Sequence, residues 1–292
     1  MRILLFLITN AAVLVLISVI FQFFGLQGLL QQNGVNLNLE GLLISSAVFG
    51  MSGSFISLLL SKWMAKRSMG VYVIEQPANA TEQWLVQSVA RMAQQAGIGM
   101  PEVGIFDSPD PNAFATGFNR NSALVAVSTG LIQSMSAEEV EAVLGHELSH
   151  VANGDMVTLG LLQGVVNTFV IFFAKIIGFF VDKVLLRSEN DRGVGIGYYV
   201  TEMIAQIVLS ILASMIVMWF SRYREFRADA GGANLAGRQK MIGALQALQR
   251  AHDPVPLPGE MAAFGINAGG MSRLFSSHPP LEERIAALRS QG

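Results

Sequence analysis

Long uncharged runs of apolar residues dominate the pattern along this chain. Residues 3–24, 41–60 and 203–220 contain no charged side chain, and residues 156–181 contain only Lys175, near the far end of that run. Each run has about the 20 residues that an α-helix needs to cross roughly 30 Å of hydrocarbon. The pattern therefore predicts about four transmembrane helices in a predominantly α-helical membrane protein.

The first apolar run is expected to remain in the protein as an anchor. Only Met1 and Arg2 precede it, and no A-x-A site follows it. A cleaved signal peptide normally has a more basic start and such a cleavage site.

The basic residues predict which side of the membrane each polar segment occupies. The loop 25–40 contains no Lys or Arg. Basic residues instead follow the second and fourth runs: Lys62, Lys66, Arg67, Arg222, Arg224 and Arg227. Because basic loops tend to stay cytoplasmic, the N-terminus, residues 61–155 and residues 221–292 are expected in the cytoplasm.

The loop between the third and fourth runs opposes this orientation. Its three basic residues are Lys183, Arg187 and Arg192, and acidic residues lie among them. The alternative that residues 156–220 form a helical hairpin in or against the bilayer, without spanning it, therefore stays open. In either case the two runs are antiparallel, so their outer ends meet on one side.

The polar region at 71–135 has the pattern of a small α+β domain. A helix is expected from about Glu82 to Ala96, with Thr81 as its cap and Gly97 at its end. Residues 103–106 predict a strand. Two further short apolar runs, 112–117 and 123–127, flank a polar loop and predict a β-hairpin.

A second helix begins at a capping box, in which Ser136 is followed three residues later by Glu139. It should continue to about Asn153, where the Gly154-Asp155 pair ends it before the third apolar run. This helix contains the sequence His-Glu-Leu-Ser-His at 146–150. A last helix is expected over 281–289.

Composition agrees with a membrane protein and narrows its chemistry. Hydrophobic residues make up 52% of the chain and charged residues 14%, against roughly 25% charged in ordinary soluble domains. A net charge of −2 gives no reason to expect a nucleic-acid partner. No nucleotide-binding loop is found. The chain has no cysteine, so a metal would need histidine and carboxylate ligands.

The pattern H-E-x-x-H predicts a zinc site. His146 and His150 are four residues apart, so on a helix they project from the same face and can share one ion. Glu147 lies beside that ion without binding it. From there it can take a proton from an attacking water and pass it to the leaving amine.

A hydrolytic zinc site needs a third protein ligand. His252 and His278 are candidates, but Glu225 is favoured, because the antiparallel third and fourth runs bring its segment close to the H-E-x-x-H helix. Asp229, one helical turn later, can accept a hydrogen bond from the outer nitrogen of a liganding histidine. The alternative is that both carboxylates pair with the neighbouring arginines 222, 224 and 227.

These motifs together resemble the HtpX-type membrane zinc endopeptidases, over nearly the whole chain. The similar segments are SKWMAKRS after the second run, residues 112–117, VAVSTGL at 125–131, EAVLGHELSHVANGDMV at 141–157, SRYREFRADA at 221–230 and SHPPLEERIAAL at 277–288. That family is related to the CAAX prenyl proteases.

The resemblance implies a role for each site residue. One Zn²⁺ per chain would be bound by His146, His150 and Glu225, with Glu147 as the general base. The family also implies a bacterial inner-membrane location, with the active site facing the cytoplasm. Its members act in proteolytic quality control under stress, so unfolded or misassembled membrane proteins are the expected substrates, and adaptor partners stay unidentified.

Two further positions follow from the related prenyl proteases. Asn112 and His278 match residues that line the cleft there and stabilise the oxyanion, as an amide or an imidazole can. The alternatives are turn chemistry for Asn112 and a helix-entry position for His278. The edge from Asn112 to Thr116, which includes Ala113 and Phe114, is also expected to pair with an extended substrate.

The expected domain organisation follows. Residues 1–60 form two transmembrane helices with a short periplasmic loop. Residues 61–155 form the first part of a cytoplasmic, zincin-like α+β protease domain with a short β-sheet. Residues 156–220 form a transmembrane or membrane-embedded hairpin. Residues 221–292 form the second part of the protease domain.

Two other functions compete with a membrane-surface endopeptidase. An intramembrane-cleaving metalloprotease is disfavoured, because acidic residues on the H-E-x-x-H helix would be costly in hydrocarbon. A non-catalytic zinc-binding chaperone or scaffold is disfavoured by Glu147, since a structural site has no need of a carboxylate between its histidines. An ATP-independent endopeptidase is the expected function.

Overall fold

The computed structural model describes residues 19, 28, 38–186, 194–252 and 276–290. Contacts along the chain define two compact units. We call residues 1–56 with 160–217 the membrane unit, and residues 57–159 with 218–292 the sheet unit. The first apolar run, residues 3–24, lies almost entirely outside the described residues.

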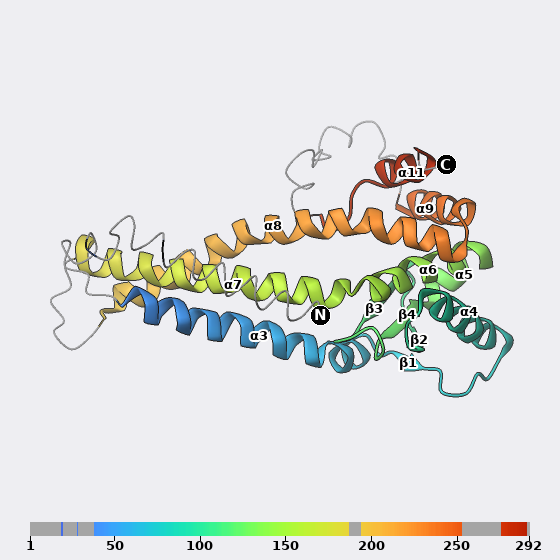
Figure 1. Cartoon of the computed structure of the whole chain (residues 1–292), viewed down its shortest axis with the longest axis horizontal. Helices are drawn as coiled ribbons and strands as arrows, with labels where there is room; N and C mark the ends of the chain where they lie inside the picture. Colours follow the sequence, from blue (N-terminus) through green and yellow to red (C-terminus); the bar gives the residue numbers. More distant parts are fainter. Residues whose placement is uncertain (1–18, 20–27, 29–37, 187–193, 253–275, 291–292) are drawn as a thin grey trace, which may run out of the picture. The chain divides into compact units, whose positions relative to one another are not determined.

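Three long helices correspond to the second, third and fourth apolar runs (Figure 1). They are α3 (Leu39–Ser68), α7 (Asp155–Phe180), which continues into a short π-helix at Val181–Leu185, and α8 (Ile196–Ala236). Each is long and apolar enough to cross a membrane. The expected mostly helical fold with long apolar helices is therefore confirmed for this part of the chain.

Within the membrane unit, α3 and α7 pack closely through small residues. Ser46, Gly50 and Ser54 are buried and lie one turn apart on α3. A Cβ atom at Gly50 would lie 2.6 Å from the backbone nitrogen of Thr168 on α7. Small residues at such spacing allow helix backbones to approach closely in membranes, where packing drives association.

Two acidic residues of the membrane unit have partners. The Nζ atom of Lys175 on α7 lies 3.8 Å from Oε1 of Glu202 on α8. The backbone N–H of Gly195 donates to the carboxylate of Asp182 at 3.0 Å. Pairing of this kind lowers the cost of charged groups inside an apolar helix bundle.

The sheet unit contains a mixed four-stranded sheet in the order β1-β2-β4-β3. The strands are β1 (Tyr72–Val73), β2 (Glu102–Phe106), β3 (Ala113–Thr116) and β4 (Leu124–Ser128). β2 and β4 are parallel, whereas β1 pairs antiparallel with β2 and β3 antiparallel with β4. The predicted hairpin is therefore confirmed as β3–β4, and β3 lies at the edge of the sheet.

The cap of α4 (Ala80–Ala96) differs from the prediction. The N-cap is Asn79, whose side chain accepts a hydrogen bond from the backbone N–H of Glu82, and not Thr81. The Glu82 carboxylate in turn accepts from the N–H of Ala78. Asparagine caps at least as well as threonine, and this reciprocal pairing favours the earlier start. The predicted end at Gly97 is confirmed, with φ of 63°.

The helix that contains the H-E-x-x-H pattern is α6 (Ala137–Asn153). It begins at the predicted capping box of Ser136 and Glu139 and ends at Gly154, with φ of 67°. The short helix α5 (Thr129–Ser134) precedes it, and α7 starts directly after it at Asp155. The side chains of Leu144 and Leu148 are fully buried and anchor α6 in the core.

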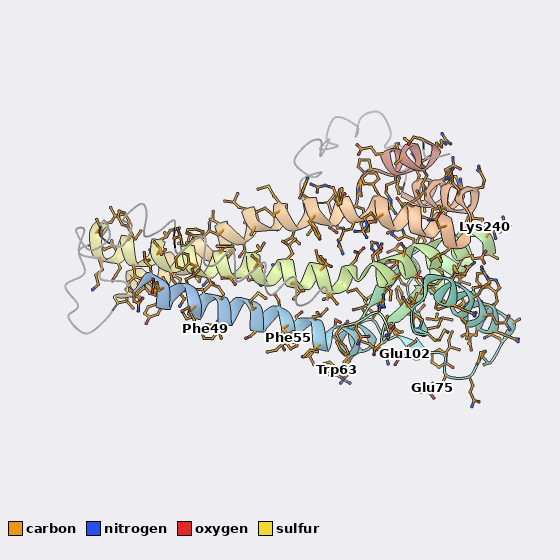
Figure 2. All side chains as sticks on the ribbon, viewed as in Figure 1. Phe49, Phe55, Trp63, Glu75, Glu102 and Lys240 are labelled. Carbon is orange, nitrogen blue, oxygen red and sulfur yellow. The ribbon has the colours of Figure 1, made fainter. Side chains whose placement is uncertain are left out.

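The core of the sheet unit surrounds α6. This helix contacts α4, strands β3 and β4, and α9 (Arg238–His252), and α9 in turn contacts α11 (Leu281–Ser290) (Figure 1). The last part of α3 is tied to the sheet by charge. Lys62 and Lys66 both pair with Glu102 of β2, which Figure 2 labels. The ion pairs hold the end of α3 against β2, whereas the contacts with β3 and β4 hold one face of α6 against the sheet.

Candidate metal centre and cleft

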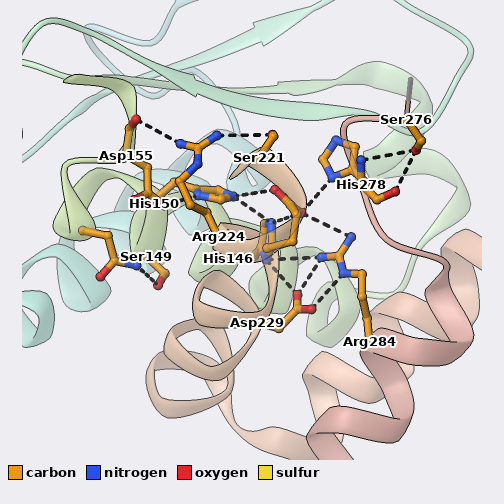
Figure 3. A network of polar contacts seen from close by, with 12 residues as sticks. His146, Ser149, His150, Asp155, Ser221, Arg224, Asp229, Ser276, His278 and Arg284 are labelled. Atoms are coloured by element: carbon orange, nitrogen blue, oxygen red, sulfur yellow. Dashed lines mark hydrogen bonds and ion pairs between the residues drawn. The ribbon is translucent and has the colours of Figure 1, made fainter. Parts of the chain in front are cut away.

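His146 and His150 occupy one face of α6, as their spacing requires (Figure 3). Their rings meet edge to face, with centroids 4.7 Å apart. The two Nε2 atoms lie only 3.2 Å from each other. Two nitrogen atoms held this close, with their ring planes fixed, are suited to a shared cation.

Glu225, from α8, completes a group of three donors. Its Oε2 atom is 3.4 Å from Nε2 of His146, and its Oε1 atom is 3.2 Å from Nε2 of His150. Zinc bonds of about 2.0–2.1 Å in a tetrahedron give ligand-to-ligand edges of about 3.3 Å. The three measured separations match that edge, so this donor set fits a zinc ion.

The outer nitrogen of each histidine faces a carboxylate. Nδ1 of His146 lies 3.0 Å from Oδ1 of Asp229, and Nδ1 of His150 lies 2.8 Å from Oδ2 of Asp155. When each Nδ1 donates its hydrogen to the carboxylate, the Nε2 lone pair of a neutral imidazole is free for a metal. The predicted contact of Asp229 with a histidine is present, and Asp155 is a second one that the sequence reasoning missed.

The carboxylates control the protonation of the two histidines. Burial alone would lower the pKa of His146, but hydrogen bonds with Asp229 and Glu225 raise it. Burial acts in the same way on His150, whose pKa is raised to about 10 by Asp155 and Glu225. Burial would raise the pKa of Glu225, yet the histidines lower it well below its ordinary range. Protons and a metal ion therefore compete for this site.

Arg284 on α11 is a buried residue of the site that sequence reasoning did not single out. Its Nε and Nη2 atoms donate to the two carboxylate oxygens of Asp229, at 2.8 and 2.6 Å. Its Nη1 atom is 3.4 Å from Oε2 of Glu225. The guanidinium thus stabilises both carboxylates as anions. The only sequence signal for a role of Arg284 was its place in the segment 277–288, which resembles the HtpX-type family.

The neighbouring arginines of α8 make other contacts. Arg224 donates to the backbone carbonyl of Asp155 at 2.9 Å and to Ser221. Arg227 donates to the side chain of Asn153 at 3.2 Å. These hydrogen bonds connect α8 to the end of α6 and the start of α7. Glu225 and Asp229 instead face the histidines.

His278 also reaches the site. Its Nδ1 atom lies 2.7 Å from Oε2 of Glu225, while more than half of its side-chain surface is exposed. Its ligand atoms are not part of the compact three-donor group found among the described residues. His252 is the last residue of α9, and its side chain lies outside the described part of the chain.

An open cleft of about 1320 Å³ adjoins the donor group. His146, Glu147 and His278 line it, as do Asn112 and Ala113 at the start of β3. Within the described residues, the Glu147 carboxylate has no hydrogen bond or ion pair, so it remains available to a molecule in the cleft.

Phe114 does not line this cleft. Its ring packs against Phe106 of β2, with centroids 5.5 Å apart. Of the expected substrate-facing residues, the structure therefore brings Asn112 and Ala113 to the cleft, together with His278, and leaves the Phe114 side chain on the sheet.

A solved structure shares this fold. The crystal structure of S. mikatae Ste24p aligns with a TM-score of 0.61 at 19% identity, over 93% of this chain and 66% of the Ste24p chain. At that identity the likeness supports the fold alone.

Sequence comparisons show the family. The model of peptidase family M48, whose members are zinc-dependent, matches residues 79–291. Protease HtpX of Thioalkalivibrio sulfidiphilus is 63% identical over 292 residues, which cover 99% of this chain and 98% of the relative. Protease HtpX of Pseudoalteromonas atlantica is 63% identical over 288 residues, which cover 99% of each chain. The chain therefore belongs to peptidase family M48, as a multi-pass membrane metalloprotease of the HtpX type.

Proposed function

We propose that this chain is a zinc-dependent, ATP-independent endopeptidase of the bacterial inner membrane, acting on misfolded or damaged membrane proteins. One observation carries the catalytic part of the proposal. Glu147 lines an open cleft directly beside three donors spaced for a tetrahedral metal site.

A zinc ion at His146, His150 and Glu225 would supply Lewis acidity, which polarises a peptide carbonyl and makes a water molecule acidic near neutral pH. Glu147 takes the proton of the attacking water and then delivers it to the leaving amine. Asp155, with Asp229, holds the imidazoles in the orientation that directs both Nε2 atoms to one point.

Asn112 and His278 would stabilise the oxygen that becomes negative during attack. Both line the cleft, although they are far apart in the sequence, and both carry N–H donors. Donors fixed before the reaction contribute because they need no reorganisation when charge develops.

The edge strand β3 would bind the substrate backbone. Within the described residues β3 pairs on one side only, with β4, and its first residue, Ala113, lines the cleft. An extended peptide can add to such an edge through main-chain hydrogen bonds, which gives broad sequence tolerance.

Alanine methyl NMR of the Glu147→Gln variant tests this binding mode. A bound, uncleaved peptide should shift the methyl signals of Ala113 and Ala115 on β3, while Ala126 on the interior strand β4 serves as the control. Shifts confined to other strands would exclude β3 as the binding edge.

The catalytic proposal is tested by comparing the wild type with Glu147→Gln, each purified in detergent and loaded with zinc. An unfolded model protein is the substrate, without nucleotide. We expect cleavage by the wild type only, and equal zinc content in both proteins. Cleavage by both would indicate a contaminating protease. Zinc binding without cleavage of any unfolded substrate would favour the non-catalytic scaffold, and a strict need for ATP would contradict the second part of the proposal.

A further inference from the structure

One wall of the cleft is formed by aromatic side chains of α8. Trp219, Tyr223 and Phe226 are spaced by four and three residues, so they share one face of the helix. All three line the same cleft as His146 and Glu147. We call these three residues the aromatic wall.

The aromatic wall leaves much apolar surface uncovered. Trp219 is 63% exposed and Tyr223 is 62% exposed. Large aromatic side chains bury about 150–250 Å² each when they are covered, so a substrate side chain that packs against them gains a large area of apolar contact. Exposed apolar surface inside a concave site indicates a binding function more strongly than single exposed residues elsewhere.

The wall also has the right position along α8. Phe226 directly follows the metal-group residue Glu225. Trp219 precedes Glu225 by six residues, which corresponds to about 9 Å along a helix axis. An extended peptide advances about 3.3 Å per residue, so a peptide that crossed the cleft from the metal group towards Trp219 would span this distance with about three residues.

We propose that the aromatic wall is the specificity site of the enzyme, and that it binds a large apolar side chain of the substrate up to about three residues from the scissile bond. This inference rests on the proposed endopeptidase function and names its preferred substrate class: extended peptides with Leu, Phe or similar residues near the cleavage point. Unfolded segments that border apolar spans of membrane proteins have this composition.

The test uses the full-length chain in detergent micelles, loaded with zinc. Paired fluorogenic peptides differ only by Leu or Ser at one position, which is scanned over four positions on each side of the scissile bond. The ratio of kcat/KM values for each pair measures the preference, and it cancels differences in enzyme concentration. We expect the wild type to favour Leu by about tenfold or more at one of these positions.

Substitutions then locate the preference. Trp219→Ala should lower the Leu-to-Ser ratio by about tenfold through KM, whereas Trp219→Phe should restore most of it. Trp63→Ala is the matched control, because Trp63 is 61% exposed but does not line the cleft; it is labelled in Figure 2. An unchanged ratio in Trp219→Ala, an equal loss for both peptides, or the same change in Trp63→Ala would overturn the inference.

A binding measurement separates this inference from the proposed function. Fluorescence anisotropy of the labelled peptides is recorded on Glu147→Gln, alone and combined with Trp219→Ala. A preference for the Leu peptide that depends on Trp219 supports the aromatic wall even when no peptide is cleaved by the wild type. Cleavage by the wild type with no binding preference leaves the endopeptidase intact and removes the aromatic wall as its specificity site.

Discussion

At the residue scale, the orientation of the two histidines in the candidate metal group depends on carboxylates that contact their Nδ1 atoms. His146 and His150 each face one, and the two carboxylates come from different helices. Asp155 is the first residue of α7, so its orientation is fixed by the break between α6 and α7. The hydrogen bond that one ring nitrogen of an imidazole makes decides that the other nitrogen remains for the metal.

We therefore predict that Asp155→Asn weakens zinc binding by about 10- to 100-fold, because an amide accepts the His150 hydrogen less strongly than a carboxylate. Competition with a zinc-chelating dye measures the affinity of the purified protein. Asp110→Asn is the control, since Asp110 lines the cleft without contacting the metal group. An unchanged zinc affinity in Asp155→Asn would show that His150 is oriented by other contacts.

A second residue-scale prediction concerns pH. The pKa of His150 is raised to about 10 in the metal-free protein, so this histidine is protonated at pH 7, whereas a metal ligand must be neutral. Zinc must then displace protons, and its affinity should increase as the pH rises from 6 towards 9. Isothermal titration calorimetry in buffers of different ionisation enthalpy counts the protons released. Affinity that is independent of pH would contradict the protonated state.

The same shift has a defined effect on the metal-free fold. Because the pKa of folded His150 lies above its ordinary value of 6.5, its interactions with Asp155 and Glu225 stabilise the metal-free protein fully below that ordinary value. This contribution is lost as the pH rises towards 10.

At the element scale, the close packing of α3 against α7 requires glycine at position 50 but not at position 53, three residues later. A Cβ at Gly50 would meet the backbone of Thr168, while a Cβ at Gly53 would meet nothing within 4 Å. Overpacking of this kind typically costs about 1–3 kcal/mol.

Gly50→Ala should therefore lower the midpoint of unfolding, and Gly53→Ala should leave it unchanged or raise it slightly, since alanine favours the helix. Both variants are compared with the wild type by circular dichroism during denaturation in mixed micelles. Equal stability of the two variants would show that α3 and α7 separate enough to accept a methyl group at Gly50.

At the scale of the whole molecule, the membrane orientation is a prediction that the absence of cysteine makes easy to test. The exposed side chain of Glu138 on α6 belongs to the sheet unit, which is expected in the cytoplasm, whereas Gln32 lies in a loop expected in the periplasm. Each is replaced by Cys in turn, which gives chains with one thiol.

A membrane-impermeant maleimide should label Glu138→Cys only in inside-out vesicles and Gln32→Cys only in intact spheroplasts. The two variants serve as controls for each other. Labelling of Glu138→Cys in spheroplasts would reverse the predicted orientation, and it would place the cleft on the periplasmic side.

The sequence by itself determined the features that depend on local pattern. The long apolar runs predicted α3, α7 and α8, two short apolar runs around a polar loop predicted the β3–β4 hairpin, and the capping box with Gly154 predicted both ends of α6. Such signals work because periodicity and capping act within a few residues. The histidine pair follows in the same way, since two residues one turn apart always share a helix face.

Tertiary structure decided the contacts between that pair and residues distant in the sequence. The antiparallel apolar runs favoured Glu225, and its place one helical turn later favoured Asp229, but the contacts of both with His146 depend on how α8 packs against α6. In the sequence, Asp155 was only part of the helix break at Gly154-Asp155, and Arg284 was not singled out within the last predicted helix. Both contact the candidate metal group only because packing of the sheet unit brings their helices together, and no short segment of sequence records that packing.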